Sequence, residues 1–256
     1  MKTRIISAIV MAIICAIPLF YGGIYIDLLA GFMILTGCYE FCSIRHKRFN
    51  IFIYLTMVAF VALINLVQTH TVGLILLYII ILFTLAIVSE EITLDDVCSV
   101  FMMGIIIAFA SLSVVTIYSF NQGYLVMLYI LTAAFGCDIA ALFTGMVFGK
   151  HKLNPRVSPK KTVEGAIGGW LFGCLLSFLF AYFFIGEHMT FFAINSFALP
   201  IVAQIGDLSF SLIKRNYGVK DYGSLIPGHG GILDRIDSLL FCLIFFISMV
   251  TFLWEI

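Results

Sequence analysis

The feature that most constrains this chain is a series of nine apolar segments, separated by short interruptions that contain polar residues, glycine or proline. About 20 apolar residues are enough to cross a hydrocarbon core of roughly 30 Å, and in lipid the backbone must satisfy its own hydrogen bonds as a helix. Hydrophobic residues make up 62% of the chain and charged residues only 11%, which excludes a soluble globular domain. The sequence therefore predicts an all-α fold, a polytopic transmembrane bundle of about nine spans at residues 5–20, 23–44, 50–68, 72–89, 98–119, 123–149, 165–186, 190–213 and 232–254.

The lysines and arginines predict how this bundle is oriented. The chain has 14 of them, yet none lies in residues 51–149. Nine spans place all the cationic segments on one face of the membrane, which by the positive-inside rule is the cytoplasmic face. The N-terminus is thus expected in the cytoplasm, and the first apolar run is expected to be a transmembrane helix rather than a signal peptide. The cations lie at Lys2 and Arg4 and within residues 45–48, 150–161 and 214–235.

Polar side chains are distributed unevenly, and this divides the chain into two predicted regions. Residues 1–122 hold about five spans with few charges, which suits a scaffold that gives lipid access. Residues 123–256 hold the remaining spans and two basic cytoplasmic loops, which suits a catalytic region, because ionisable residues at membrane depth usually serve a function.

The acidic residues of the first region have structural explanations. Thr93 or Asp95, which precede an apolar run, are expected to cap a helix. Glu40 and Asp27 lie near span ends, where a solvated position is the default. We therefore expect the chemistry to lie in the C-terminal region.

Four aspartates in the C-terminal region are candidates for binding a cation. Asp138 lies about eleven residues before the cytoplasmic end of its span, and Asp207 about seven residues before Lys214, so both reach into the membrane. Asp234 and Asp237 are three residues apart and share one face of a helix. A charge at membrane depth costs about 2.5–3.5 kcal/mol, which favours a functional role over interhelical hydrogen bonding. Because Mg²⁺ prefers oxygen ligands and keeps water and substrate phosphate around it, these side chains predict a magnesium site.

Two cytoplasmic loops carry patterned charge. The loop KRNYGVKDYGSLIPGHGG combines Lys214, Arg215 and Lys220 with Asp221 and several glycines. Cations beside carboxylates, with glycines that let the backbone come close, predict a site for a polyphosphate and its metal. The other loop contains SPKKTVEG and places lysines and hydroxyls just before a helix, a geometry suited to phosphate, although basic loops also fix topology and attract anionic lipid.

The segment SLIKRNYGVKDYGSLIPGHGGILDRID, residues 211–237, resembles the C-terminal signature of the CDP-diacylglycerol synthases, also called phosphatidate cytidylyltransferases. KR, KD, PGHGG and DRID all fall at the family's spacing. FGKHKLNPRVSPKKTVEG and GDLSFSLIKR resemble two further blocks, so the resemblance covers residues 136–238. The chain departs from the family's pattern at Leu142 and Val163, where an aromatic residue and tryptophan are usual. We expect these two changes to alter packing rather than reaction type.

The resemblance implies transfer of CMP from CTP to phosphatidate, giving CDP-diacylglycerol and pyrophosphate, with Mg²⁺ as cofactor and room for a second, monovalent cation. Two anions must approach in this reaction, so a metal and cationic side chains are expected to offset their repulsion. No strong general base is required, because a phosphate monoester is largely ionised near neutral pH. The expected site then comprises metal ligands at Asp138, Asp207, Asp234 and Asp237, catalytic residues Asp207, Asp234, Asp237, Lys214, Lys220 and Asp221, and substrate-binding residues Ser158, Lys161, Thr162, Arg215, His229, Gly230, Gly231 and Arg235.

An ion-coupled secondary transporter or channel is the alternative from another class, since aspartates in membrane helices also line ion pathways. Such transporters often have two related halves, whereas here only the C-terminal half carries the charge pattern, which favours the enzyme. The expected partners are CTP, phosphatidate and the bilayer, with no nucleic acid, and a homodimer through a glycine-rich face stays open. A single chain of this size suits a bacterial inner membrane, with the active site facing the cytoplasm.

Overall fold

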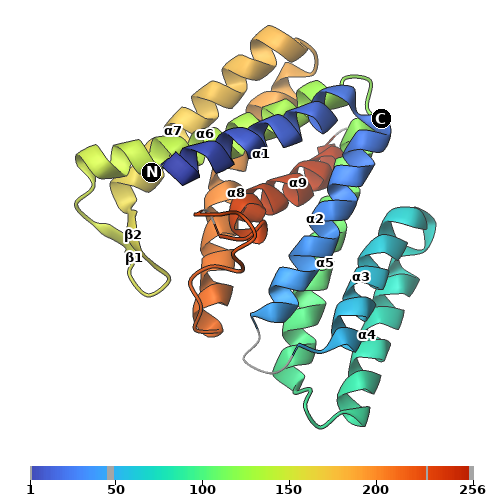
Figure 1. The fold of residues 1–256 in the computed structure, drawn as a ribbon. Helices are drawn as coiled ribbons and strands as arrows, with labels where there is room; N and C mark the ends of the chain where they lie inside the picture. The colour runs from blue at the N-terminus through green and yellow to red at the C-terminus, as the bar shows by residue number, and fades with distance from the viewer. Residues whose placement is uncertain (1, 45–48, 229, 254–256) are drawn as a thin grey trace. The chain divides into compact units, whose positions relative to one another are not determined.

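The computed structural model describes residues 2–44, 49–228 and 230–253, and this part of the chain is mostly helical (Figure 1). Two longer connections are residues 149–162, which contain one small sheet between the sixth and the seventh α-helix, and residues 217–232, which precede the last α-helix. The elements are α1 (Lys2–Tyr21), α2 (Gly23–Ser43), α3 (Ile51–Leu66), η1 (Gln68–His70), α4 (Thr71–Val88), α5 (Leu94–Tyr118), α6 (Gly123–Phe148), β1 (Lys152–Asn154), β2 (Ser158–Thr162), α7 (Val163–Phe180), η2 (Ala181–Ile185), α8 (Met189–Asn216) and α9 (Leu233–Leu253).

Seven helical segments of the described chain are long and apolar enough to cross a membrane, which confirms a polytopic helical membrane protein. They are Gly23–Ser43, Gln68–Val88, Leu94–Tyr118, Gly123–Phe148, Val163–Ile185, Met189–Asn216 and Leu233–Leu253. The other two expected spans correspond to α1 and α3, which are not among the seven. α3 has 16 residues, about 24 Å at helical rise, which is less than the thickness of a typical hydrocarbon core. The count of nine spans therefore stays a prediction.

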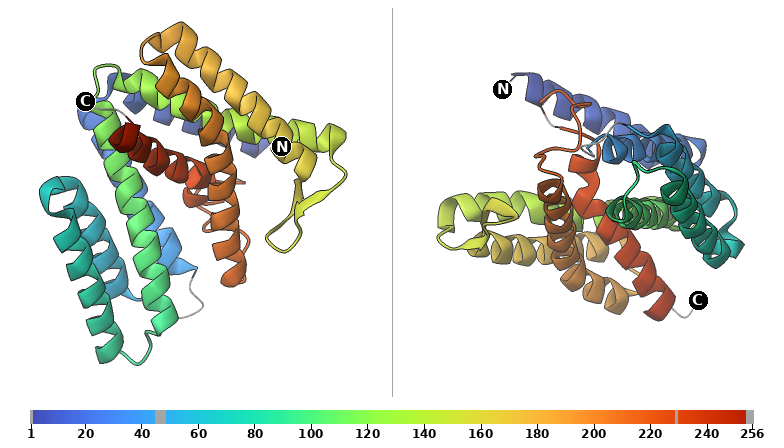
Figure 2. Two further views of the ribbon diagram at one scale, coloured as in Figure 1. Left: turned by 180° about the vertical axis from the view of Figure 1, so that it is seen from behind. Right: turned by 90° about the horizontal axis from the view of Figure 1, so that it is seen from below.

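The chain forms two compact units. Unit 1 comprises Met1–Val115 and Asp221–Arg235, and unit 2 comprises Thr116–Lys220 and Ile236–Ile256. In unit 1, α2 packs against α1 and α3, and α3 packs against α4. In unit 2, α6, α7 and α8 pack against one another, as the three ribbon views show (Figures 1 and 2). The Asp221–Arg235 segment thus belongs with the N-terminal helices although it follows α8 in the sequence.

Two helices of unit 1 begin at side chains that bind their free backbone N–H groups. Asn50 Oδ1 accepts hydrogen bonds from the N–H of Phe52 at 3.0 Å and of Ile53 at 3.3 Å, at the start of α3. At the start of α5, Asp96 Oδ2 accepts from the Thr93 N–H at 2.9 Å, and Thr93 Oγ1 accepts from the Asp96 N–H at 3.4 Å. This reciprocal pair confirms Thr93 as the capping residue, a role worth about 1 kcal/mol in typical helices.

The basic loop between α6 and α7 contains a two-stranded antiparallel sheet, which the all-α expectation did not include. Asn154 lies opposite Ser158, and the Asn154 side chain accepts a hydrogen bond from the Val157 N–H at 3.2 Å. Pro155 and Pro159 favour an extended backbone in the residues that precede them, so this segment forms a hairpin instead of continuing the helix.

α6 and α7 approach closely because α7 presents small side chains to α6. Gly165, Gly169, Gly173 and Ser177 recur every four residues along α7, and all four are buried. A Cβ added at Gly169 would lie 2.7 Å from the Cβ of Ala141 and 2.8 Å from the carbonyl oxygen of Cys137. Small residues at this spacing let two membrane helices pack backbone to backbone.

We expect Gly169→Ala to destabilise unit 2, because the added methyl group overlaps α6 and one helix must shift. Overpacking of this kind costs about 1–3 kcal/mol, which would appear as a lower midpoint of thermal unfolding in detergent. Gly73→Ala in α4 is the matched control, since nothing lies within 4 Å of the added Cβ there. Equal midpoints for the two variants would contradict the close packing.

Candidate active site

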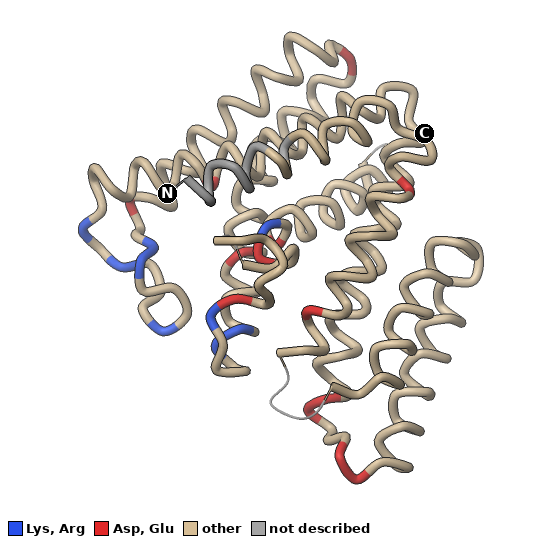
Figure 3. The backbone as a smooth tube through the Cα atoms, in the orientation of Figure 1, with Lys and Arg blue, Asp and Glu red and all other residues tan. Residues whose placement is uncertain are grey.

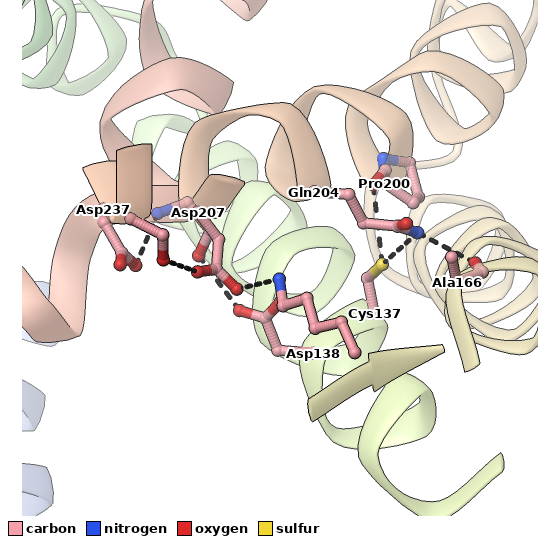
Figure 4. Close-up of polar contacts among 10 residues, drawn as sticks. Cys137, Asp138, Ala166, Pro200, Gln204, Asp207 and Asp237 are labelled. Carbon is pink, nitrogen blue, oxygen red and sulfur yellow. Dashed lines mark hydrogen bonds and ion pairs between the residues drawn. The ribbon is translucent and has the colours of Figure 1, made fainter. Parts of the chain in front are cut away.

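Asp138, Asp207 and Asp237 come together in unit 2 from three different helices, α6, α8 and α9 (Figure 4). The Ser238 hydroxyl donates a hydrogen bond to Asp138 Oδ2 at 3.0 Å, and the Ser238 N–H donates to Asp237 Oδ1 at 2.8 Å. The Ser211 hydroxyl donates to Asp207 Oδ1 at 3.4 Å. Asp237 is only 8% exposed, so this acidic cluster is largely shielded from solvent.

Gly206 explains how α8 and α9 come close enough to form the cluster. A Cβ added at Gly206 would lie 2.9 Å from the carbonyl oxygen of Asp237 and 3.0 Å from the Cβ of Phe241. No larger residue fits there without moving one helix. Because Asp207 follows Gly206 directly, the close approach places Asp207 beside Asp237.

Two lysines face the three carboxylates. Lys161, in β2, forms an ion pair with Asp207, and both side chains are mostly buried, at 29% and 23% exposure. Lys214, in the last turn of α8, is 7% exposed and interacts electrostatically with Asp237. By formal charge, three carboxylates and two lysines leave one negative charge in excess, which favours the binding of a further cation.

The chemistry of this donor set fits a hard divalent cation. Carboxylate and hydroxyl oxygens are the ligands that Mg²⁺ prefers, and water or substrate phosphate ordinarily completes its octahedron. Among the residues that the structure describes, no group of three or more His, Cys, Asp or Glu side chains is arranged to enclose a metal ion. In the structure, one oxygen of Asp207 pairs with the Lys161 ammonium. The assignment of these aspartates as metal ligands stays a prediction.

Asp234, the fourth expected ligand, belongs to unit 1 and binds backbone amides. Its Oδ2 accepts hydrogen bonds from the N–H of Tyr222 at 2.8 Å and of Gly231 at 2.9 Å. Asp234 therefore orders the Asp221–Arg235 segment. Gly228 and Gly230 have φ angles of 78° and 87°, a backbone conformation that favours glycine. A metal-binding role for Asp234 stays a prediction.

Two residues expected to bind substrate also hold the loops of unit 2 together. Thr162 Oγ1 accepts a hydrogen bond from the Gly165 N–H at 3.1 Å and caps α7. Arg215 donates from Nε to the carbonyl of Val157 at 3.3 Å and from Nη1 to the carbonyl of Val219 at 3.0 Å. Both side chains thus position the basic loops, and their contact with substrate stays a prediction.

The remaining expected residues range from exposed to buried, and one lies outside the described chain. Lysines and arginines gather on the β1–β2 hairpin and near the C-terminal end of α8 (Figure 3). Lys220, Asp221 and Arg235 are exposed, Ser158 and Gly230 are half-buried, Gly231 is buried, and His229 lies outside the described residues.

The sequence did not point to Glu164, which holds the base of the hairpin. Its carboxylate accepts hydrogen bonds from the N–H of Lys150 at 3.0 Å and of His151 at 3.2 Å. It also lies 2.6 Å from Nδ1 of the His151 ring. Its place in the first turn of α7 indicated a capping role at most, because its partners Lys150 and His151 lie 14 and 13 positions earlier in the chain.

The expectation that Glu40 is solvated was wrong. Glu40 is 4% exposed and accepts hydrogen bonds from the N–H of Ile232 and of Leu233, each at 2.9 Å. The signal in the sequence was a carboxylate among the last apolar residues of a span, LTGCYEFC. A carboxylate that is buried there needs hydrogen-bond donors to offset the loss of its hydration.

The chain is similar to the cytidylyltransferase family, whose sequence model matches residues 2–253. A protein of Thermotoga maritima named "Phosphatidate cytidylyltransferase" is 35% identical over 263 residues, which cover 94% of this chain and 93% of that protein. A Haemophilus influenzae protein of the same name is 45% identical over 130 residues, 49% of this chain and 45% of that protein. A third, from Staphylococcus aureus strain COL, is 42% identical over 125 residues, 48% of each chain. In the last two matches the chain spans about half the length of its relatives.

Proposed function

The chain belongs to the cytidylyltransferase family, and from this premise we propose that it transfers CMP from CTP to phosphatidate, giving CDP-diacylglycerol and pyrophosphate. The observation that carries the proposal is the acidic cluster of Asp138, Asp207 and Asp237 beside Lys161 and Lys214, in a protein with apolar spanning helices. The name of the Thermotoga maritima relative, which aligns over nearly its whole length, supports the choice of substrates.

The cationic side chains would overcome the repulsion between the substrates. The phosphate of phosphatidate must approach the α-phosphorus of CTP, and both groups are anionic. Lys161 and Lys214 lie beside the acidic cluster, where they would donate hydrogen bonds to phosphate oxygens and hold the two groups in line. The exposed cations Lys220 and Arg215 would contact the same phosphates, and Arg235 is a further residue proposed to bind substrate.

The acidic cluster would hold Mg²⁺ through Asp138, Asp207 and Asp237, and the metal-binding role that the sequence predicts for Asp234 stays part of the proposal. When bound, Mg²⁺ supplies a positive charge that stabilises the negative charge developing on the leaving pyrophosphate. A second, monovalent cation is part of the same cofactor proposal. The hydroxyls of Ser211 and Ser238 donate hydrogen bonds to Asp207 and Asp138 and would thereby orient these carboxylates for the cation.

No side chain has to act as a strong base, because the attacking phosphate is already ionised near neutral pH. Catalysis then consists of positioning and of electrostatic stabilisation. The residues proposed to bind substrate also include Ser158, Thr162, His229, Gly230 and Gly231, and Asp221 is kept as a proposed catalytic residue.

The same proposal extends to topology. Nine spans, with the N-terminus in the cytoplasm, would place both basic loops and the active site on the cytoplasmic face of a bacterial inner membrane. Single cysteines introduced in residues 150–161 should then react with a membrane-impermeant reagent only after the membrane is opened. A homodimer is proposed as well, and cross-linking in native membranes tests it.

The activity is tested by pyrophosphate release from the full chain purified in detergent. We expect release only when CTP, phosphatidate and Mg²⁺ are all present, with CDP-diacylglycerol formed in equal amount. Chelation of the divalent cation should stop the reaction, and added Mg²⁺ should restore it. A folded protein that releases no pyrophosphate in the presence of lipid would overturn the proposed function.

A further inference from the structure

A buried carboxylate on α2 holds the start of α9, and the proposed chemistry makes no use of it. Glu40 Oε1 accepts a hydrogen bond from the Ile232 N–H, and Oε2 accepts one from the Leu233 N–H, each at 2.9 Å. Glu40 and both donors belong to unit 1, and Glu40 is 4% exposed. These are N–H groups at a helix start, which have no acceptor within the helix itself.

Two glycines, Gly223 and Gly231, lie directly against the Glu40 carboxylate. A Cβ added at Gly223 would lie 2.9 Å from Glu40 Oε1, and one added at Gly231 would lie 2.5 Å from both Glu40 oxygens. Neither glycine has a positive φ angle, so a side chain added at either position would force the Glu40 carboxylate to move rather than strain the backbone. The Asp221–Arg235 segment is therefore packed around the Glu40 carboxylate.

Asp234 and Glu40 both accept hydrogen bonds from backbone N–H groups of the Asp221–Arg235 segment. Asp234 binds the amides of Tyr222 and Gly231 within the segment itself, whereas Glu40 reaches it from α2. A local capping residue would satisfy the helix start without tying it to another helix. A carboxylate from α2 also fixes where the segment lies, and the positive end of the helix dipole compensates its buried charge.

We propose that Glu40 is a positioning residue for CTP binding: it holds the Asp221–Arg235 segment against α2, in the conformation in which Gly230 and Gly231 receive the nucleotide. The inference rests on the proposed function, which assigns that segment to the nucleotide. Glu40 itself touches no substrate and acts through the amides of Ile232 and Leu233.

The first test is Glu40→Gln in the full chain. The amide keeps one acceptor but turns an N–H toward the second backbone donor, so one hydrogen bond to a charged group is lost. We expect the KM for CTP to rise by about ten- to a hundredfold, while the KM for phosphatidate stays within about twofold. A general loss of folding would instead reduce the active fraction and leave both KM values unchanged. Asp27→Asn, at an exposed position on the same helix, is the matched control.

The second test is a mutant cycle that pairs Glu40→Ala with Gly223→Ala. In the wild-type background the Gly223→Ala methyl group would displace the Glu40 carboxylate and raise the KM for CTP. In the Glu40→Ala background the same methyl group has nothing to displace, so its added effect should fall to less than about twofold. Equal effects in both backgrounds would overturn the proposal.

Amide hydrogen exchange separates failure of this inference from failure of the proposed function. Peptides covering residues 222–235 should exchange about tenfold faster or more in Glu40→Gln than in wild type, whether or not the protein turns over CTP. If exchange is faster in Glu40→Gln but the wild-type protein is inactive, Glu40 still anchors the segment and the proposed activity is rejected. An active wild type, with unchanged exchange and an unchanged KM for CTP in the variant, would reject the role of Glu40.

Discussion

Replacing Asp237 with asparagine is expected to lower kcat by about 10²- to 10³-fold, the usual cost of removing one preorganised electrostatic group. Asp237 is buried at 8% exposure, beside Asp138 and Asp207, and its charge is part of what would hold the cation. Asparagine keeps the shape of the side chain but removes the charge. The measurement is the rate of pyrophosphate release at saturating CTP and phosphatidate, with Mg²⁺ varied.

The same substitution should not lower the stability of the protein. Burial disfavours the charge of Asp237, and Asp207 and Asp138 repel it; together these effects outweigh its attraction to Lys214, so neutralising it is not expected to cost stability. We therefore expect an unfolding midpoint equal to or above that of wild type, as happens when a functional site keeps charges that folding does not need. Asp95→Asn, at an exposed position in the first turn of α5, is the control for kcat. A turnover within about threefold of wild type in Asp237→Asn would remove this residue from the metal site.

The second large effect is expected for Lys161→Met, which keeps the length of the side chain and removes its charge. The variant should lose about 10²- to 10³-fold in kcat/KM, because a phosphate of the substrate loses its cationic partner in a partly buried site. It should also be less stable by about 1–3 kcal/mol, because Asp207 loses its ion-pair partner beside two other carboxylates.

Lys160→Met supplies the matched control, because Lys160 is the neighbouring residue in β2 and is exposed. We expect its kcat/KM to stay within about threefold of wild type. Adding Asp207→Asn to Lys161→Met should restore most of the lost stability, because the unpaired Asp207 charge is removed. It should not restore activity, because both the lysine and the carboxylate are then missing. A double variant that regains turnover would show that the pair is structural only.

Several features of the fold could be predicted from the sequence because they depend on neighbouring residues alone. The length of the apolar runs determined the membrane helices, and Thr93 before an apolar run indicated the cap of α5. Asp138 and Asp207 were predicted to be functional because each interrupts an apolar run. In all these cases the physical cause acts within a few residues along the chain.

Other features depend on which helices meet, and local spacing says little about that. The three-residue spacing of Asp234 and Asp237 predicts a shared metal, which stays a prediction, but it gave no indication that the Asp234 carboxylate binds the amides of Tyr222 and Gly231. Glu40 was expected in solvent, but it accepts hydrogen bonds from residues almost 200 positions later in the chain. Neither partner can be read from the residues next to these side chains.

The membrane helices and the charged C-terminal half thus follow from the order of residues alone, and the motifs indicated the family. Which charged side chains come together depends on how the helices pack. Gly206 lets α9 come against α8 and brings Asp237 to Asp207, and the β1–β2 hairpin carries Lys161 to the same cluster. The physical reason is that burial and helix periodicity are local properties, whereas the close approach of two backbones depends on small residues that face each other across different helices.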